Sequence, residues 1–191
     1  MNINTMNKYP NSRILKFPRL IATLLPLLLA FCPLRAEDAD SLDMLAPALK
    51  DVSALKTNIG TATPVVEDDR VVGVKLEAEN SREDYIGVGI PTPDGGWDLS
   101  SFEAVEAEVE NVGYGEITPS LVLNNRVIPR GYANGVRLAP GKTGVIRVRF
   151  GYHWGEPTDE IDLQAVDLVK VHIHPNESGA FIIRSIRAVR N

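Results

Sequence analysis

The sequence has very little cysteine: the single one, Cys32, lies in an apolar stretch near the N-terminus. A lone cysteine cannot close an intramolecular disulfide, so the fold must depend on an apolar core. The sequence also lacks the Ser-His-Asp arrangement, the paired carboxylates and the glycine-rich phosphate loop of familiar enzyme classes. No motif in the chain therefore predicts catalysis.

The first 36 residues contain no acidic side chain and have the order of a secretory signal peptide. Their basic residues ahead of the apolar run are Lys8, Arg13, Lys16 and Arg19. The apolar run LIATLLPLLLAF at 20–31 contains Pro26 and is shorter than the roughly 20 residues of a membrane span. A small residue, Ala36, ends the short segment that follows, as at a cleavage site. We predict that 1–36 is a cleaved signal peptide and that the protein is exported to the periplasm or secreted.

Removal of 1–36 leaves 155 of the 191 residues, close to the usual size of one domain. The cleavage position is open by a few residues, because Leu34 stands where such signals have a small side chain. Phe31 precedes Cys32, whereas lipoprotein signals have a small residue there. Lipidation of Cys32 is therefore the weaker alternative.

Charge limits the partners of the protein. The whole chain has a formal net charge of −5. Five of its 20 basic residues and none of its 25 acidic residues lie in 1–36, so the remainder carries 15 against 25 and a net charge of −10. Such a domain repels phosphate backbones and anionic membrane surfaces. Nucleic acid and membrane are not expected as partners, whereas a neutral ligand meets no such objection.

The segment 37–62 is predicted to be a linker or a short helix. Leu42, Leu45 and Leu49 have helical spacing after a possible N-cap at Ser41, but Pro47 interrupts the pattern. We leave both alternatives open.

From about residue 63 the apolar period changes to two, and Gly, Pro and Asn clusters separate short runs. Eight strands are predicted, at 71–79, 85–90, 104–110, 118–123, 135–138, 144–150, 168–174 and 180–189. No helical pattern lies between them. This organisation predicts an all-β domain over 63–191, an antiparallel two-sheet sandwich or jelly roll.

The alternation also predicts which side chains face the core. Along 104–110, valine and alanine alternate with glutamate, and along 144–150 apolar residues alternate with Arg147 and Arg149. The glutamates and arginines are expected to be cross-strand partners on a solvated face if the two strands are neighbours. The predicted core includes Val105, Ala107, Val109, Leu121, Leu123, Ile146, Val148, Val169, Val171 and Ile173.

Four segments in order resemble a known module. They are GWDLSSFEAV at 96–105, SLVLNN at 120–125, VRLAPGKT at 136–143, and the pair VDLVKVHI at 166–173 and FIIRSIR at 181–187. This order resembles the carbohydrate-binding-like β-sandwich found N-terminal to the catalytic barrel of bacterial agarases and related glycoside hydrolases, a relative of the galactose-binding-like jelly rolls. The resemblance covers about 71–189. It implies a non-catalytic module in which Trp97 packs across one end of the sandwich.

The chain departs from that resemblance at two points. Arg184 and Ser185 stand where the last strand of those modules has an acidic and a second polar residue, so a site built on that carboxylate is not expected. The catalytic barrel of those enzymes is not part of the sequence, so we do not expect an enzyme. A calcium ion near 67–69 would follow from analogy to jelly rolls alone, because these acidic residues lack a ligand spacing. No cofactor or metal is predicted.

Candidate ligand residues lie in two loops. Sugar recognition uses exposed aromatic faces together with amide, carboxylate or guanidinium groups. The first loop contains Tyr152, His153 and Trp154 between two glycines. The second set combines amide, guanidinium and phenol groups and consists of Asn124, Asn125, Arg126, Arg130 and Tyr132. Alternatively, the rings form a lid over the end of the core and the asparagines are only turn residues.

His172 and His174 are two residues apart on one predicted strand, so their imidazoles share a face. This spacing occurs in metal sites, but no third ligand accompanies them, and we expect a structural or solvent-facing role. Three functions stay open. A polysaccharide- or oligosaccharide-binding module is favoured, a structural domain that docks on a protein partner is the alternative, and a small jelly-roll lyase or hydrolase comes third, with Tyr152 and His153 as acid and base beside Arg126 or Arg130.

Overall fold

The computed structural model describes residues 40–58, 60–78, 85–125, 131–159, 161–174 and 177–190. All of them belong to one compact unit, Arg35–Asn191. The predicted signal peptide, 1–36, lies outside the described residues. Among these residues no helix is long and apolar enough to cross a membrane.

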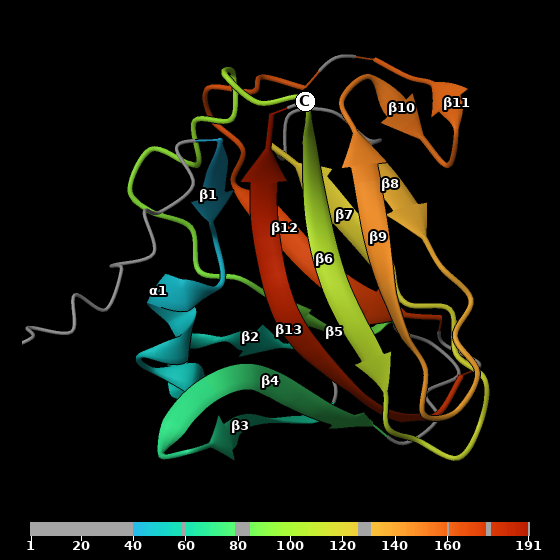
Figure 1. Ribbon diagram of the computed structural model, residues 1–191. Helices are drawn as coiled ribbons and strands as arrows, with labels where there is room; N and C mark the ends of the chain where they lie inside the picture. Colours follow the sequence, from blue (N-terminus) through green and yellow to red (C-terminus); the bar gives the residue numbers. More distant parts are fainter. Residues whose placement is uncertain are drawn as a thin grey trace, which may run out of the picture. The chain divides into compact units, whose positions relative to one another are not determined.

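Two β-sheets make up the domain (Figure 1). The first contains β1 (Ser41–Asp43), β3 (Thr61–Glu67), β4 (Arg70–Ala78), β6 (Ala104–Asn111), β9 (Thr143–Arg149) and β13 (Gly179–Val189). The second contains β2 (Lys56–Thr57), β5 (Ile86–Gly89), β7 (Ser120–Asn124), β8 (Tyr132–Gly135), β10 (Tyr152–His153), β11 (Glu156–Pro157) and β12 (Leu168–Ile173). The six-stranded sheet has the order β3-β4-β13-β6-β9, with β1 on β13, and the seven-stranded sheet has the order β11-β10-β8-β7-β12-β5-β2.

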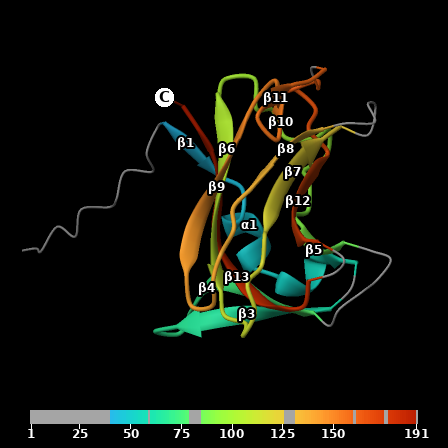
Figure 2. The same ribbon diagram turned by 90° about the vertical axis from the view of Figure 1, so that its right-hand side faces the viewer.

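The core lies between the two sheets, which Figure 2 shows edge-on as two layers. Each of the ten residues predicted for the core is at most 1% exposed. Val105, Ala107 and Val109 point inward from β6, while Glu106, Glu108 and Glu110 point outward. An alternating strand buries its apolar face only when a second layer covers it. The two sheets with a buried core between them confirm the prediction of a two-sheet antiparallel sandwich.

The outer face of the six-stranded sheet is laced with ion pairs. β6 and β9 are neighbours, and Glu106 lies opposite Arg147 and forms an ion pair with it, as the alternation predicted. Arg184 is the extra residue of a bulge in β13, between Ile183 and Ser185. Its guanidinium pairs with Glu110 and Glu67, and these hydrogen bonds raise the pKa of Arg184. The arginine that departs from the resembling modules thus bridges two strands.

The hairpin that joins β3 to β4 turns at Asp68 and Asp69, which have φ angles of 48° and 60°. Two successive positive φ values are typical of a type I′ turn, which Asn and Asp tolerate. Strand β3 was not predicted from the sequence. Its partly exposed edge gives it a weak alternation, since only Ala62 and Val65 among its residues are partly covered.

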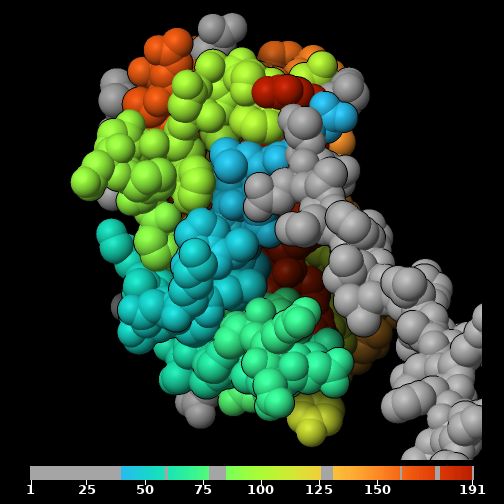
Figure 3. Space-filling view, turned by 60° about the vertical axis from the view of Figure 1, so that its left-hand side comes forward, coloured from blue at the N-terminus to red at the C-terminus, as the bar shows by residue number. Residues whose placement is uncertain are grey.

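The segment expected to be a linker or short helix is built into the sandwich. It contains β1, one turn of helix α1 (Ala46–Leu49) and the 3₁₀ turn η1 (Val52–Ala54). Met44 and Leu45 are almost completely buried. Figure 3 shows this segment, in blue to cyan, packed between the β3–β4 hairpin and the chain that follows β5. The sandwich therefore begins near residue 41 rather than at 63.

Candidate functional site

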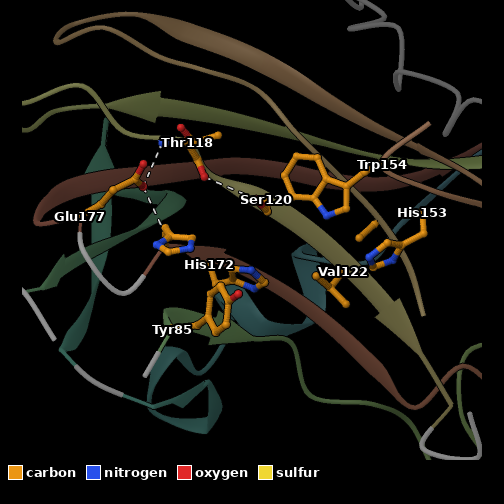
Figure 4. Close-up of a pocket in the computed structure, with 10 residues that line it drawn as sticks. Tyr85, Thr118, Ser120, Val122, His153, Trp154, His172 and Glu177 are labelled. Carbon is orange, nitrogen blue, oxygen red and sulfur yellow. Dashed lines mark hydrogen bonds between the residues drawn. The ribbon is translucent and has the colours of Figure 1, made fainter. Parts of the chain in front are cut away.

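A pocket of about 360 Å³ opens on the outer face of the seven-stranded sheet, within the range of small-ligand sites. We call it the Tyr85–Trp154 groove (Figure 4). Its lining residues are Tyr85, Thr118, Ser120, Val122, Ala133, His153, Trp154, His172, His174 and Glu177. Side chains of β7, β8 and β12 alternate between the core and the outer face of the sheet, and those on the outer face line the groove.

Strand register explains the floor of the groove. His172 lies opposite Ser120, and Ser120 lies opposite Gly135. In the next row, Val122 lies opposite Ala133, and Ala133 forms the bridge to His153. With strands about 4.8 Å apart, the floor between β12 and β8 is roughly 10 Å wide at the backbone. Ser120, Val122 and Ala133 on this floor have small side chains, which leaves room for a ligand.

Trp154 forms one wall. It is 50% exposed and has a φ of 53°, while Gly155 has a φ of 84°. Because His153 pairs with Glu156, Trp154 and Gly155 are the loop of a two-residue hairpin. The positive φ values of Trp154 and Gly155 match a type I′ turn. The Trp154 amide donates to the carbonyl of Ala133 at 2.7 Å, which fixes the turn over β8. A bulky residue in this backbone region costs on the order of 1–3 kcal/mol, and such strain often marks a functional position.

Tyr85, the residue before β5, forms the opposite wall and is 47% exposed. Its ring meets those of His172 and His174 edge to face, with centroids 4.6 Å and 5.6 Å apart. Antiparallel pairing of β5 with β12 brings these residues together. The two histidines therefore brace the tyrosine at an angle that leaves about half of it open to solvent.

Polar groups define the groove between these walls. The Glu177 carboxylate accepts hydrogen bonds from the backbone N–H groups of Thr118 at 3.0 Å and His174 at 3.2 Å. His153 Nδ1 lies 2.8 Å from the carbonyl oxygen of Gly131 and therefore donates its proton there. In the neutral ring, Nε2 is then an acceptor. Figure 4 shows Glu177 and His153 apart, with Ser120 and Val122 between them.

The His172 ring is largely buried beside Tyr85. Burial, and to a smaller extent the charges of Lys170 and His174, together lower the pKa of His172 to about 4. Its Nδ1 has no hydrogen-bond partner among the described residues. His172 is thus neutral at neutral pH and acts as an apolar support for the tyrosine ring.

The predicted aromatic loop is divided by its own hairpin. His153 and Trp154 line the groove, but Tyr152 does not, and the guanidinium of Arg149 lies 5.0 Å from its ring centroid. Alternation along β10 directs Tyr152 and His153 to opposite sides. The expected single surface of three adjacent rings is therefore not formed.

Tyr132, expected among the ligand residues, belongs to the core. It is 1% exposed, its hydroxyl accepts from the Ile161 amide at 3.1 Å, and its ring stacks with Phe150 at 6.0 Å. β8 directs Tyr132 inward and Ala133 outward, and the short run YANG has no apolar alternation that would have predicted this.

The two predicted asparagines lie away from the groove. Asn124 accepts from the amide of Asn125, and Asn125 lines a second pocket beside Asp94 and Asp167 at the end of the sheet. Arg126 and Arg130 lie outside the described residues. Trp97 packs partly buried against the core, as expected, and its backbone bridges to Val166.

Sequence reasoning missed Tyr85, Thr118, Ser120 and Glu177 as groove residues. The same-face pattern of His172 and His174 was the one signal that pointed to this face. Within the part of the chain that the structure describes, no three His, Cys, Asp or Glu side chains are grouped to hold a metal ion. Asp68 and Asp69, which belong to the stretch 67–69 considered for calcium by analogy, are the turn residues of the β3–β4 hairpin.

Comparison with solved structures shows the fold. No family model matches the sequence, and no curated protein matches it. An exo-β-agarase superposes with a TM-score of 0.64 at 15% identity, covering 80% of this chain and 25% of the enzyme. The agarase AgWH50C gives 0.61 at 13% identity, with the same coverage of both chains. A family 11 carbohydrate-binding module from Clostridium thermocellum, in complex with a β-1,3-1,4-mixed-linked tetrasaccharide, gives 0.53 at 17% identity and covers 79% of this chain and 95% of the module.

This chain spans about a quarter of the length of the agarases that it matches, but it corresponds to nearly the whole of the carbohydrate-binding module. The resemblance expected from the sequence is thus confirmed at the level of the fold: the described residues form the β-sandwich shared by agarase modules and family 11 carbohydrate-binding modules.

Proposed function

We propose that this protein is an exported, non-catalytic module that binds a polysaccharide or oligosaccharide in the Tyr85–Trp154 groove. One observation carries the proposal: two half-exposed aromatic rings stand on opposite sides of one pocket with a floor of small side chains. The fold shared with carbohydrate-binding modules supports the same reading. Export rests on the sequence of 1–36, which has the order of a signal peptide.

Aromatic walls suit sugars because a pyranose ring has apolar C–H faces and a rim of hydroxyl groups. The exposed ring faces of Tyr85 and Trp154 provide apolar contact area. Glu177, Ser120 and His153 provide acceptors for hydroxyl protons near the floor. Large exposed aromatic side chains are otherwise unfavourable on a soluble domain, so their presence together on one face indicates a binding surface.

The test is a binding titration of the protein with neutral oligosaccharides, beginning with the β-1,3-1,4-glucan tetrasaccharide and agaro-oligosaccharides. Tyr85→Ala and Trp154→Asn should each weaken binding at least tenfold, because each removes a stacking face. Asparagine is chosen at 154 because it tolerates the positive φ of the turn. Affinity should change little with salt, since stacking is not driven by charge.

The matched control is Tyr114→Ala. Tyr114 is fully exposed in the loop between β6 and β7 and does not line the groove. The Tyr114→Ala variant should bind the neutral oligosaccharides with the same affinity as the unchanged protein. If no neutral oligosaccharide binds, or if the groove variants and Tyr114→Ala have equal affinities, the proposed function is wrong.

A further inference from the structure

The Glu177 carboxylate contributes a fixed negative charge to the groove. It is the one acidic side chain among the described lining residues, and no lysine or arginine is among them. Two backbone amides, from Thr118 and His174, bind the same oxygen, Oε2. The carboxylate is therefore held in position by backbone just before β7 and just after β12 rather than by a flexible counter-ion.

This arrangement leaves the second carboxylate oxygen, Oε1, without a bond among the described residues, and Glu177 is one of the residues that line the groove (Figure 4). A carboxylate oxygen only accepts hydrogen bonds. Oε1 can thus receive a proton from a ligand hydroxyl group, and it repels a ligand carboxylate or sulfate at the same position.

No lysine or arginine among the described lining residues offsets this charge. His172 has a pKa lowered to about 4 by burial and by its neighbours Lys170 and His174, so it carries no charge near pH 7. Nδ1 of His153 already donates to the Gly131 carbonyl. Lys170 is on the same sheet face, but its Cε lies within 2.8 Å of where a Cβ on Gly87 would stand, so its side chain extends over β5.

We infer that Glu177 is the specificity-determining residue of the groove. Its carboxylate accepts a hydrogen bond from a hydroxyl group of an uncharged sugar and excludes carboxylated or sulfated sugars by charge repulsion. This inference rests on the proposed function. It adds a residue and a ligand class: neutral sugars with a free hydroxyl group at the position that faces Glu177.

The experiment compares the affinity of the protein for each neutral oligosaccharide with its affinity for the same oligosaccharide oxidised to a carboxylate at C6. The β-1,3-1,4-glucan tetrasaccharide and its C6-carboxylated form are the first pair, titrated at low and at high salt. The carboxylated form should bind about tenfold more weakly at low salt, and added salt should narrow this difference. Equal or tighter binding of the carboxylated form would overturn the inference.

Glu177→Gln tests the residue itself. The amide oxygen of glutamine can still accept from Thr118 and His174, so the variant keeps the local structure and loses the charge. The difference between neutral and carboxylated ligands should shrink to less than threefold in this variant. In the control, Glu108→Gln, an equal charge is removed from the outer face of the other sheet, and the tenfold difference should remain.

The two proposals fail in different ways. If Tyr85→Ala abolishes binding of the neutral sugar but Glu177→Gln leaves the discrimination unchanged, the inference about Glu177 is wrong and the binding function stands. If neutral sugar binding is absent or insensitive to Tyr85→Ala, both are wrong.

Discussion

The indole of Trp154 lies directly against the backbone of Gly135: a Cβ on Gly135 would stand 2.7 Å from Cη2 of the ring. A real Cβ does not approach another atom so closely, so the absent side chain lets the ring lie against β8. The same imaginary Cβ would be 2.9 Å from Ser120 Oγ. One glycine thus sets the position of a groove wall and the space above its floor.

Gly135→Ala should weaken glycan binding about tenfold and leave the fold intact. The half-exposed indole can swing outward to make room for the methyl group, which moves the stacking face away from the floor. The measurement is affinity for the neutral tetrasaccharide together with thermal unfolding. Gly115→Ala is the control, because Gly115 has no atom within 4 Å of the added Cβ. Equal affinity in the two variants would contradict this account of the wall.

We predict that the backbone of Trp154 is strained and that the indole at this position serves binding rather than stability. Trp154→Ala and Trp154→Asn both remove the indole, but asparagine tolerates a φ of 53° better than alanine does. We expect both variants to lose affinity, and Trp154→Asn to unfold with a free energy about 0.5–1 kcal/mol higher than Trp154→Ala. Urea denaturation measures the difference. A less stable asparagine variant would show that the backbone at 154 is relaxed.

Periodicity predicted the core better than it predicted the groove. Val105 and Glu106 could be assigned to opposite faces from their neighbours alone, because a strand alternates wherever one side is covered. The contact of Tyr85 with His172 depends on β5 pairing with β12, two strands that are far apart in the sequence. The glycines that flank the 152–154 loop indicated a turn, yet local pattern could not tell that the turn would separate Tyr152 from Trp154.

Tyr132→Phe should reduce stability without changing affinity. The hydroxyl of Tyr132 accepts from the buried amide of Ile161, and phenylalanine would leave that amide without this partner. Loss of such a bond costs about 1–3 kcal/mol. Chemical denaturation and a glycan titration test the two parts. If affinity falls while stability is unchanged, Tyr132 takes part in binding, contrary to its burial in the core.

His172 should make the domain less stable in mild acid. Its pKa is lowered to about 4, first by burial and then by Lys170 and His174, whereas an unfolded chain has a histidine pKa of about 6.5. Between these values the unfolded chain binds a proton at this position and the folded domain does not. The free energy of unfolding should therefore fall as the pH falls from about 6.5 to about 4, by up to roughly 3 kcal/mol, and this contribution should be constant above that window.

His172→Gln removes the titrating group while keeping a polar side chain beside Tyr85, so the stability of this variant should fall less over the same pH range. Urea unfolding of the unchanged protein and of His172→Gln at several pH values gives the difference between their free energies of unfolding. The carboxylates are the same in both proteins, so their titration cancels in this difference. Parallel curves for the two proteins would mean that the folded domain accommodates a charged imidazole beside Tyr85, and the ring would then not be the apolar support that its burial indicates.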